Sequence, residues 1–296
     1  MKAAPASAAP AGRPPGALGY VRRLARSSRS NFYYAFLILP RAQRRAILAV
    51  YGFCRAADDA VDDAPDLASA ERAVEFWRAE IARGLAGEAQ HPIAVRAGAA
   101  AREFELPREL FEDVLRGVEM DIRPRRFARW EDLAGYCDLV AGAVGRLSVR
   151  IFGWVDPSAD RYAGDLGAAL QLTNILRDLG PDARAGRFYL PLEDLERYGV
   201  SERDVADGSP AALPLLQFEA ERARALFASA RRIGRERPRE VCAAEAMAAI
   251  YRNLLERVAR AGFPVAGPPV RVPRPVKALL AGSCWMRGRF AGGTRS

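Results

Sequence analysis

Long stretches of helix-forming residues, punctuated by proline, constrain the fold of this chain more than any other feature. Ala, Leu, Arg and Glu are abundant, whereas runs of Val, Ile and Thr of strand length are scarce. Asp156-Pro157 combines an N-cap residue with proline at the first helical position. The pattern predicts helices over residues 41–63, 68–86, 92–105, 107–120, 131–152, 157–179, 213–236 and 238–261.

These helical stretches are expected to form one unit. Neither a break in composition nor an internal repeat divides the chain, so we expect a single all-helical domain over residues 21–290. Residues 1–20, mostly Ala, Pro and Gly, are expected to be a disordered leader without the apolar core of a signal peptide. The segment from Asp182 to Leu195 is expected to be an irregular loop. Charge-free stretches such as Ser30 to Pro40 are shorter than the ~18–20 apolar residues of a spanning helix, so a cytoplasmic protein is predicted.

Cysteine, histidine and lysine usage excludes several chemistries. The four cysteines are far apart and form no C-x-x-C pair, which excludes a zinc ribbon or a thioredoxin-like site and fits a reducing compartment. The single histidine, His91, makes H-E-x-x-H zinc binding impossible. Lys2 and Lys277 are the only lysines, neither of them in a P-loop, and no G-x-G-x-x-G occurs. Carboxylates, arginines, amides, tyrosines and any metal that they recruit remain.

The net charge of +9 comes almost entirely from scattered arginines. A solvated arginine surface would explain it, and so would an anionic partner such as nucleic acid, a membrane surface or a phosphorylated substrate. The sequence contains no recognisable nucleic-acid-binding motif, so nucleic acid is not an expected partner. A non-catalytic basic module that binds nucleic acid or protein is kept as an alternative of another class.

An acidic stripe emerges from an otherwise apolar predicted helix. Tyr51, Arg55, Asp58 and Asp62 share one helical face, with the two aspartates one turn apart. Carboxylates so placed repel each other unless a cation lies between them, and oxygen ligands of this kind suit Mg²⁺. The simpler alternative is that four aspartates end a helix in solvent.

A second polar stripe lies further along the chain. Gln171, Asn174, Asp178 and Asp182 again share a face, and the two amides fall inside an uncharged run. Buried amides need partners, which a ligand, a metal shell or a polar helix–helix contact would supply. If the two stripes faced each other, they would hold several divalent ions and bind a diphosphate, with Arg55 and Arg177 as donors.

Together these segments resemble the squalene/phytoene synthase family of the isoprenoid synthase superfamily. The matching elements are Tyr51–Asp63, Gln171–Asp182, Tyr136–Gly145, Asn31–Phe36 and Gly186–Pro191, and their order and separations match over most of residues 28–262. Gly117–Asp121 and Gly145–Arg150 are most similar to the bacterial presqualene diphosphate synthases of hopanoid pathways. The resemblance implies one helical bundle around a deep apolar cavity.

The resemblance also implies a reaction and a set of site residues. The implied reaction is the head-to-head condensation (C1 of one substrate to C2–C3 of the other) of two farnesyl diphosphates to presqualene diphosphate, with several Mg²⁺ ions and without NADPH. Phytoene, dehydrosqualene and squalene synthases remain alternatives within the family. The implied metal ligands are Asp58, Asp62, Asn174, Asp178 and Asp182. Arg55, Tyr51, Arg177 and Tyr189 are expected near the diphosphates, Phe32, Phe36, Tyr136 and Gln171 in the cavity, and Tyr251 at its closure; Tyr136 and Arg55 join the aspartates as catalytic candidates.

Two parts of the sequence leave alternatives open. Pro181 predicts a kink or helix end near Gly180, which makes Asp182 a weaker candidate than Asp178. The segment from Arg274 to Phe290 mixes basic and apolar residues, so it could lie on the inner face of a membrane or pack on the bundle as a last helix. Downstream squalene-forming enzymes are further possible partners.

Overall fold

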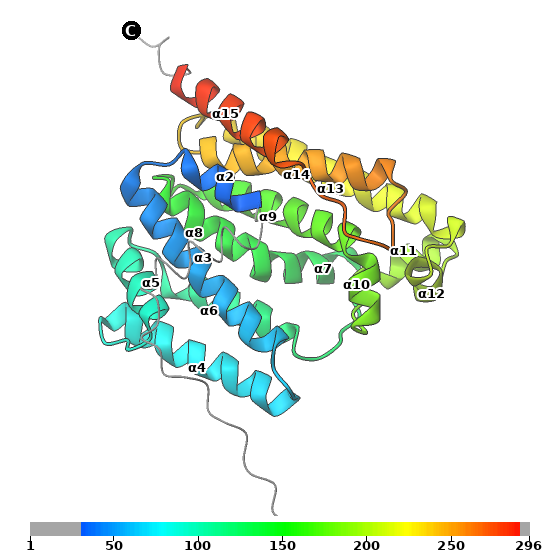
Figure 1. The fold of residues 1–296 in the computed structure, drawn as a ribbon, viewed down its shortest axis with the longest axis horizontal. Helices are drawn as coiled ribbons and strands as arrows, with labels where there is room; N and C mark the ends of the chain where they lie inside the picture. Colours follow the sequence, from blue (N-terminus) through cyan, green and yellow to red (C-terminus); the bar gives the residue numbers. More distant parts are fainter. Residues whose placement is uncertain (1–30, 291–296) are drawn as a thin grey trace, which may run out of the picture.

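The computed structural model describes residues 31–290 and, within them, the side chains of residues 34–287. Helices are its regular elements, and Figure 1 shows them as one bundle. They are α2 (Asn31–Leu37), α3 (Arg41–Asp62), α4 (Leu67–Ala86), α5 (Pro92–Glu103), α6 (Arg108–Met120), α7 (Trp130–Cys137), the π-helical turn η1 (Asp138–Gly142), α8 (Ala143–Ile151), α9 (Pro157–Arg177), α10 (Leu179–Arg184), α11 (Leu192–Tyr198), α12 (Glu202–Ala206), the 3-10 turn η2 (Pro210–Ala212), α13 (Leu213–Gly234), α14 (Cys242–Arg260) and α15 (Arg274–Phe290).

The all-α prediction is confirmed, and the predicted helices recur with small shifts at their ends. The segment 182–195 was expected to be irregular. Residues 185–191 are irregular, but α10 extends into the segment as far as Arg184 and α11 begins in it at Leu192. The predicted leader lies outside the described residues, so the limits of the domain stay a prediction. In the described range, no helix combines the length and the apolarity that a bilayer crossing requires.

Local chemistry explains where several helices begin and end. The Asp66 carboxylate caps α4 by accepting a hydrogen bond from the backbone N–H of Ser69 at 2.7 Å. Gly87 ends the same helix in the left-handed conformation, with a φ of 88°. Asp156 caps α9, and Pro157 occupies its first turn, as the sequence predicts.

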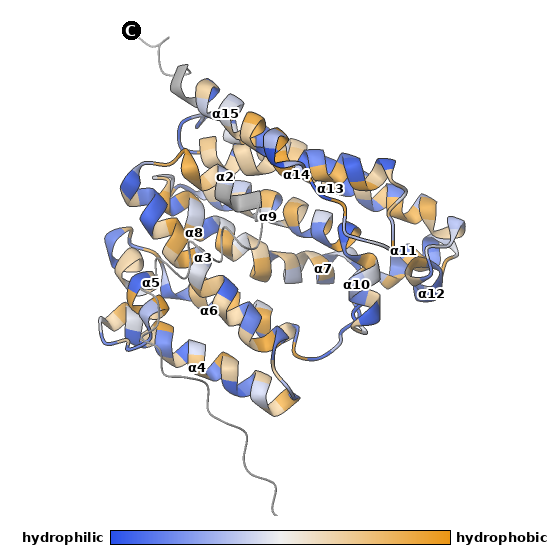
Figure 2. Cartoon of the chain, in the orientation of Figure 1, coloured by the Kyte–Doolittle hydropathy of each residue, from blue (hydrophilic) through white to orange (hydrophobic). Residues whose placement is uncertain are grey.

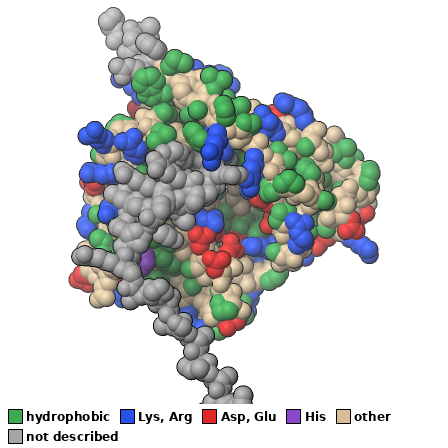
Figure 3. Space-filling view, viewed as in Figure 1, with side chains coloured by type: hydrophobic (Ala, Val, Ile, Leu, Met, Phe, Trp, Pro, Cys, Tyr) green, Lys and Arg blue, Asp and Glu red, His purple; other side chains and the backbone are tan. Residues whose placement is uncertain are grey.

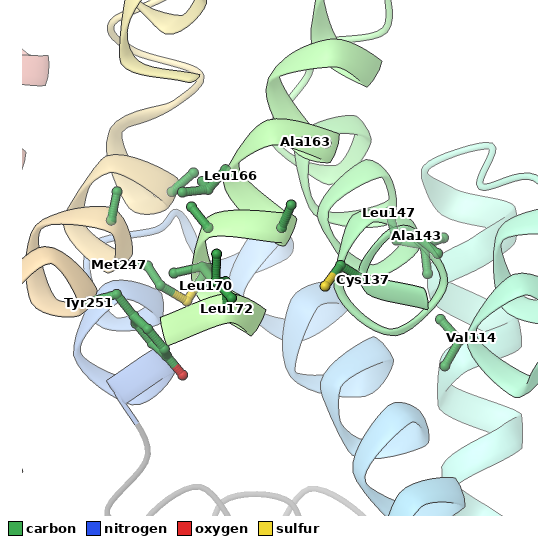
Figure 4. Packing of buried hydrophobic residues seen from close by; sticks show 14 of the residues in the cluster. Val114, Cys137, Ala143, Leu147, Ala163, Leu166, Leu170, Leu172, Met247 and Tyr251 are labelled. Atoms are coloured by element: carbon green, nitrogen blue, oxygen red, sulfur yellow. The ribbon is translucent and has the colours of Figure 1, made fainter. Parts of the chain in front are cut away.

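The long helix α9 lies in the middle of the bundle, packed against α13, α14, α8 and η1 (Figure 1). Most helices carry one hydrophobic and one hydrophilic face (Figure 2), and the hydrophobic faces meet in a continuous core. Figure 4 shows part of this core, where side chains of α9 and α14 approach each other.

Backbone contact brings α9 close to the π-helical turn. A Cβ atom on Gly167 would lie 2.7 Å from the backbone nitrogen of Gly142, so only glycine fits at this crossing. The close approach fixes η1 against α9, and both segments contribute to the wall of the cavity described below.

Candidate active site

A cavity of about 440 Å³ lies inside the bundle, between α3, α6, η1, α8, α9 and α14. Its wall is mainly apolar, with Ile47, Val114, Val118, Val144, Val149, Phe152, Leu166, Leu170 and Met247 among the lining residues. At the other end, five carboxylates line the cavity; we call this set the acidic mouth, formed by Asp58, Asp62, Asp121, Asp178 and Asp182. Figure 3 shows acidic side chains gathered beside a hollow in the middle of the face. The cavity therefore joins a charged entrance to an apolar interior.

The first part of the acidic mouth comes from the last two turns of α3. Asp58 receives a hydrogen bond from Arg55 Nη1 to its Oδ2 at 3.0 Å. Asp62 Oδ1 lies 3.2 Å from Nη1 of Arg187, which follows α10 and is 125 residues away in the chain. Side chains of two distant segments therefore meet across the entrance.

The second part comes from the junction of α9 and α10. Pro181 has no N–H to donate to the carbonyl of Arg177, and its ring would clash with that carbonyl in a continuous helix. The chain accordingly leaves helical geometry at Asp178, with a φ of −105° and a ψ of 15°. The break falls earlier than the predicted position near Gly180, yet the N–H of Asp182 still bonds to the Asp178 carbonyl oxygen at 2.9 Å. Asp182 therefore stays one turn from Asp178 and lines the same cavity.

Asp121, directly after α6, accepts hydrogen bonds from two tyrosines. The Tyr136 hydroxyl donates to both carboxylate oxygens at 3.0 and 2.9 Å, and the Tyr189 hydroxyl donates to Oδ1 at 3.2 Å. The two tyrosine rings stack with their centroids 5.4 Å apart. Burial, followed by the charge of Asp121, raises the pKa of both hydroxyl groups, so both remain protonated donors.

The carboxylates of the mouth are crowded enough to disturb one another's ionisation. Burial, followed by the charge of Asp62, raises the pKa of Asp58 to about 6. Burial and the charge of Asp178 raise the pKa of Asp182 to about 6 as well. Burial also raises the pKa of Asp121, whose negative charge adds to the shift at both Asp58 and Asp182. Asp121 thus couples electrostatically to both aspartate pairs.

A divalent cation fits the chemistry of these donors. Asn174 Oδ1, which lines the cavity, is buried and has no hydrogen-bond partner among the described residues. An unsatisfied amide oxygen beside mutually repelling carboxylates is a set of hard oxygen donors. In the part of the chain that the structure describes, no three acidic, cysteine or histidine side chains converge on one point as a preformed metal site. Arginines engage the carboxylates instead, including Arg177 at Asp178, with its Nε at 2.8 Å.

Most of the residues predicted from the sequence meet at this cavity. Its lining includes Phe36, Tyr51, Arg55, Asp58, Asp62, Tyr136, Gln171, Asn174, Arg177, Asp178, Asp182 and Tyr189. The side chain of Phe32 lies outside the described residues. Tyr251 is buried but does not line the cavity; it lies near enough to Arg177 for its charge to affect the pKa of that side chain.

Two lining residues were missed as individual candidates. Asp121 ends the segment Gly117–Asp121, and Arg187 lies in Gly186–Pro191, both of which carry the family resemblance. Asp121 and Arg187 lie outside α3 and α9, so neither residue belongs to the i, i+4 stripes of these two helices. They reach the mouth only when the chain folds. Their membership in the matching segments was the available signal.

This chain is similar to known proteins both in its fold and in its sequence. The fold is that of solved isoprenoid-forming enzymes: a dehydrosqualene synthase in complex with ligand superposes with a TM-score of 0.80 and 26% identity, covering 90% of this chain and 95% of that one. The model of the squalene/phytoene synthase family matches residues 25–276. The chain belongs to the squalene/phytoene synthase family and is thereby a prenyltransferase.

Two similar proteins of this family are named for different products. A presqualene diphosphate synthase of Rhodopseudomonas palustris is 40% identical over 257 residues, which cover 85% of this chain and 91% of that protein. A 15-cis-phytoene synthase of Synechocystis sp. is 34% identical over 278 residues, which cover 88% of this chain and 81% of that protein. The chain is thus similar to relatives whose names describe two different products.

Proposed function

We propose that this protein condenses two farnesyl diphosphates head to head to form presqualene diphosphate and release diphosphate. The observation that carries the proposal is the acidic mouth on an apolar cavity of about 440 Å³. A charged entrance suits the diphosphate, and an apolar interior suits the prenyl chains. The 40% identity to a protein named presqualene diphosphate synthase supports this choice of product.

In this proposal the oxygen donors at the entrance hold Mg²⁺. The ligands would be Asp58, Asp62, Asn174, Asp178 and Asp182, all of which line the cavity. Bound Mg²⁺ acts as a Lewis acid that neutralises the charge of the leaving diphosphate. NADPH is not expected, because the proposed product keeps a diphosphate and needs no reduction.

The arginines and tyrosines of the mouth orient the substrate in this proposal. Arg55, Arg177 and Arg187 place guanidinium groups at the entrance, where they can donate to diphosphate oxygens. Tyr51 and Tyr189 line the same region. All three arginines also engage carboxylates of the mouth, so a bound diphosphate and its cations would exchange these ion pairs for new ones.

The interior protects the reacting carbons from water. Loss of diphosphate leaves an allylic cation, which water would quench, so a dry apolar wall is required. Phe36, Tyr136 and Gln171 line the cavity, and the aromatic faces can stabilise positive charge. The Tyr136 hydroxyl is engaged by Asp121, so this ring is held in a fixed orientation.

Product analysis tests the proposal against its rivals. The purified protein is incubated with Mg²⁺ and either farnesyl or geranylgeranyl diphosphate, with and without NADPH, and the products are identified by mass spectrometry. The proposal expects a thirty-carbon diphosphate from farnesyl diphosphate, independent of NADPH. A hydrocarbon product indicates a dehydrosqualene or squalene synthase, and preference for geranylgeranyl diphosphate indicates a phytoene synthase, as the Synechocystis relative is named. Salt-sensitive DNA binding without diphosphate release would favour the non-catalytic module.

A further inference from the structure

The last helix, α15, presents two different faces. On its inner face, Lys277, Ala281 and Cys284 are buried, and the helix packs along α14 and against α2. Cys242 Sγ at the start of α14 lies 3.4 Å from the Cys284 carbonyl oxygen, which ties the two helices together. The expectation of a last helix packed on the bundle is therefore confirmed for this face.

The outer face of α15 is apolar and exposed. Leu279 is 72% exposed, Met286 50% and Trp285 43%. Met286 lies about two turns after Leu279, and Trp285 directly precedes Met286. Pro275 and Ala278 are exposed on the same side of the helix. Figure 3 shows hydrophobic side chains over α15 at the top of the view. A row of large exposed apolar residues on one helix face is typical of a binding surface rather than of a solvated one.

The charged residues of α15 and of the segment that leads into it are all basic. Glu256 is the last acidic residue of the sequence, and the residues after it include seven arginines and one lysine. Arg271, Arg274 and Arg287 are exposed at the two ends of the apolar row. Neither Arg271 nor Arg274 has an ion-pair partner among the described residues, so their charge is available to a partner.

This helix also lies close to the candidate active site. The buried ammonium group of Lys277 is near enough to Arg177, which lines the cavity, that the positive charge of Arg177 helps to lower the Lys277 pKa, after burial and the charges of Arg271 and Arg274. One helix thus connects the neighbourhood of the cavity entrance with an apolar, basic outer surface.

We propose that the outer face of α15, formed by Pro275, Ala278, Leu279, Trp285 and Met286 with Arg271, Arg274 and Arg287 at its ends, docks on an anionic lipid bilayer. The helix would lie in the interface, with its apolar side chains among the acyl chains and its arginines at the headgroups. An acidic protein would satisfy the arginines but not a row of large apolar side chains with no charged residue between Leu279 and Met286. This inference is independent of which prenyl diphosphate the enzyme uses.

Vesicle flotation with the full chain tests the docking surface. Wild-type protein should float with vesicles of phosphatidylcholine and phosphatidylglycerol, and less with phosphatidylcholine alone or at high salt. The double variant Leu279→Gln/Met286→Gln should lower the partition coefficient about tenfold, because two buried apolar side chains are lost from the bilayer. The matched control is Leu67→Gln/Val95→Gln on α4 and α5, whose side chains are 45% and 46% exposed; it should bind as wild type does.

The role of the arginines and the insertion of Trp285 into the bilayer are tested separately. Arg271→Glu/Arg274→Glu should weaken binding to anionic vesicles about tenfold and leave the weak binding to neutral vesicles unchanged. Brominated lipids should quench part of the tryptophan emission in wild type but not in Trp285→Phe. Equal flotation of wild type and both α15 variants would overturn the proposal. A dimer in solution that Leu279→Gln/Met286→Gln dissociates would overturn it as well, because a second copy would then cover this face.

Discussion

The acidic mouth and a second cluster of charged side chains, between α11 and α13, differ in how their carboxylates are satisfied. The Arg222 cluster, formed by Asp194, Glu219 and Arg222, joins α11 to α13. Nη1 of Arg222 lies 2.8 Å from Asp194 Oδ2 and 2.8 Å from both Glu219 oxygens. The guanidinium group also stacks on Trp130 and Phe218, at 4.5 and 4.7 Å from the ring centroids. All three side chains are mostly buried.

The acidic mouth gathers more carboxylates around an open cavity. Four of its five carboxylates are engaged by arginines or tyrosines around the rim, namely Asp58, Asp62, Asp121 and Asp178. Within the described structure, the carboxylate of Asp182 accepts no hydrogen bond and Asn174 Oδ1 lacks a partner. The comparison shows that buried charge by itself does not indicate function. The Arg222 cluster closes on itself and holds helices together, whereas the mouth leaves donors and space for a cation and a diphosphate.

The largest expected effect is a loss of turnover when an aspartate of the acidic mouth is substituted. Asp58→Asn and Asp178→Asn should each lower turnover by at least about 10³-fold, because each removes a charged metal ligand at the leaving group. The free energy of unfolding should stay constant or rise, since repulsion in the mouth is relieved. Diphosphate release and urea denaturation measure the two quantities.

Asp59→Asn is the matched control for that experiment. Asp59 is adjacent to Asp58 and pairs with the same arginine, with 2.5 Å between Arg55 Nη2 and Asp59 Oδ1, but it does not line the cavity. It should keep turnover within about tenfold of wild type. Unchanged turnover in both Asp58→Asn and Asp178→Asn would refute the metal assignment.

Removing the arginine of the Arg222 cluster should lower stability and leave turnover unchanged, which is the opposite of the effect expected at the mouth. Arg222→Met leaves two buried carboxylates without their cation and should lower the free energy of unfolding by about 3–5 kcal/mol. Turnover per folded molecule should remain near that of wild type. Arg203→Met, which breaks the exposed pair with Asp207, should change stability little. If Arg222→Met is as stable as Arg203→Met, the cluster does not hold α11 and α13 together.

A smaller effect is expected for the tyrosines of the mouth. Tyr136→Phe removes the hydrogen bonds to both oxygens of Asp121 and should lower kcat by about 10- to 100-fold. Tyr189→Phe removes one longer hydrogen bond to the same carboxylate and should cost less. Steady-state kinetics compare the two variants, and a larger loss for Tyr189→Phe would contradict the proposed role of Tyr136.

The smallest expected effect is a pH dependence of stability at the Arg222 cluster. Burial, together with the neighbouring Asp194 charge, raises the pKa of Glu219 to about 7 from its ordinary value of 4.5, against the lowering effect of Arg222. The folded state therefore binds this proton more tightly than the unfolded state. Its contribution is fully present below pH 4.5 and is lost as the pH rises to about 7, by on the order of 1–3 kcal/mol.

Glu219→Gln isolates that contribution. The variant cannot titrate at this position, so its free energy of unfolding should fall less than that of wild type between pH 5 and 7. Urea denaturation at a series of pH values gives the two profiles. Parallel profiles would show that Glu219 does not titrate in this range.

The sequence predicted the parts of the site that depend on helical periodicity. Asp58 and Asp62, and likewise Asn174 and Asp178, lie on shared faces because a helix repeats every ~3.6 residues, and the structure places all four at one cavity. Pro181 correctly predicted a break between α9 and α10, although it falls at Asp178. The resemblance to the family supplied the expected cavity, which no local pattern could show.

The residues that were missed depend on contacts between distant segments. Arg187 reaches Asp62 across 125 positions, and Asp121 meets Tyr136 and Tyr189 only after α6, α7 and the segment after α10 have packed. The Arg222 cluster likewise joins residues 28 positions apart. Periodicity describes one helix at a time, so pairings of this kind follow from tertiary packing.

Isothermal titration of Mg²⁺ into the protein in the presence of inorganic pyrophosphate tests most directly whether the acidic mouth binds a metal–diphosphate complex. Wild type and Asp59→Asn should show saturable binding that requires both Mg²⁺ and pyrophosphate, while Asp58→Asn and Asp178→Asn should show at least about tenfold weaker binding. Equal binding by all four proteins, or none by wild type, would contradict the account.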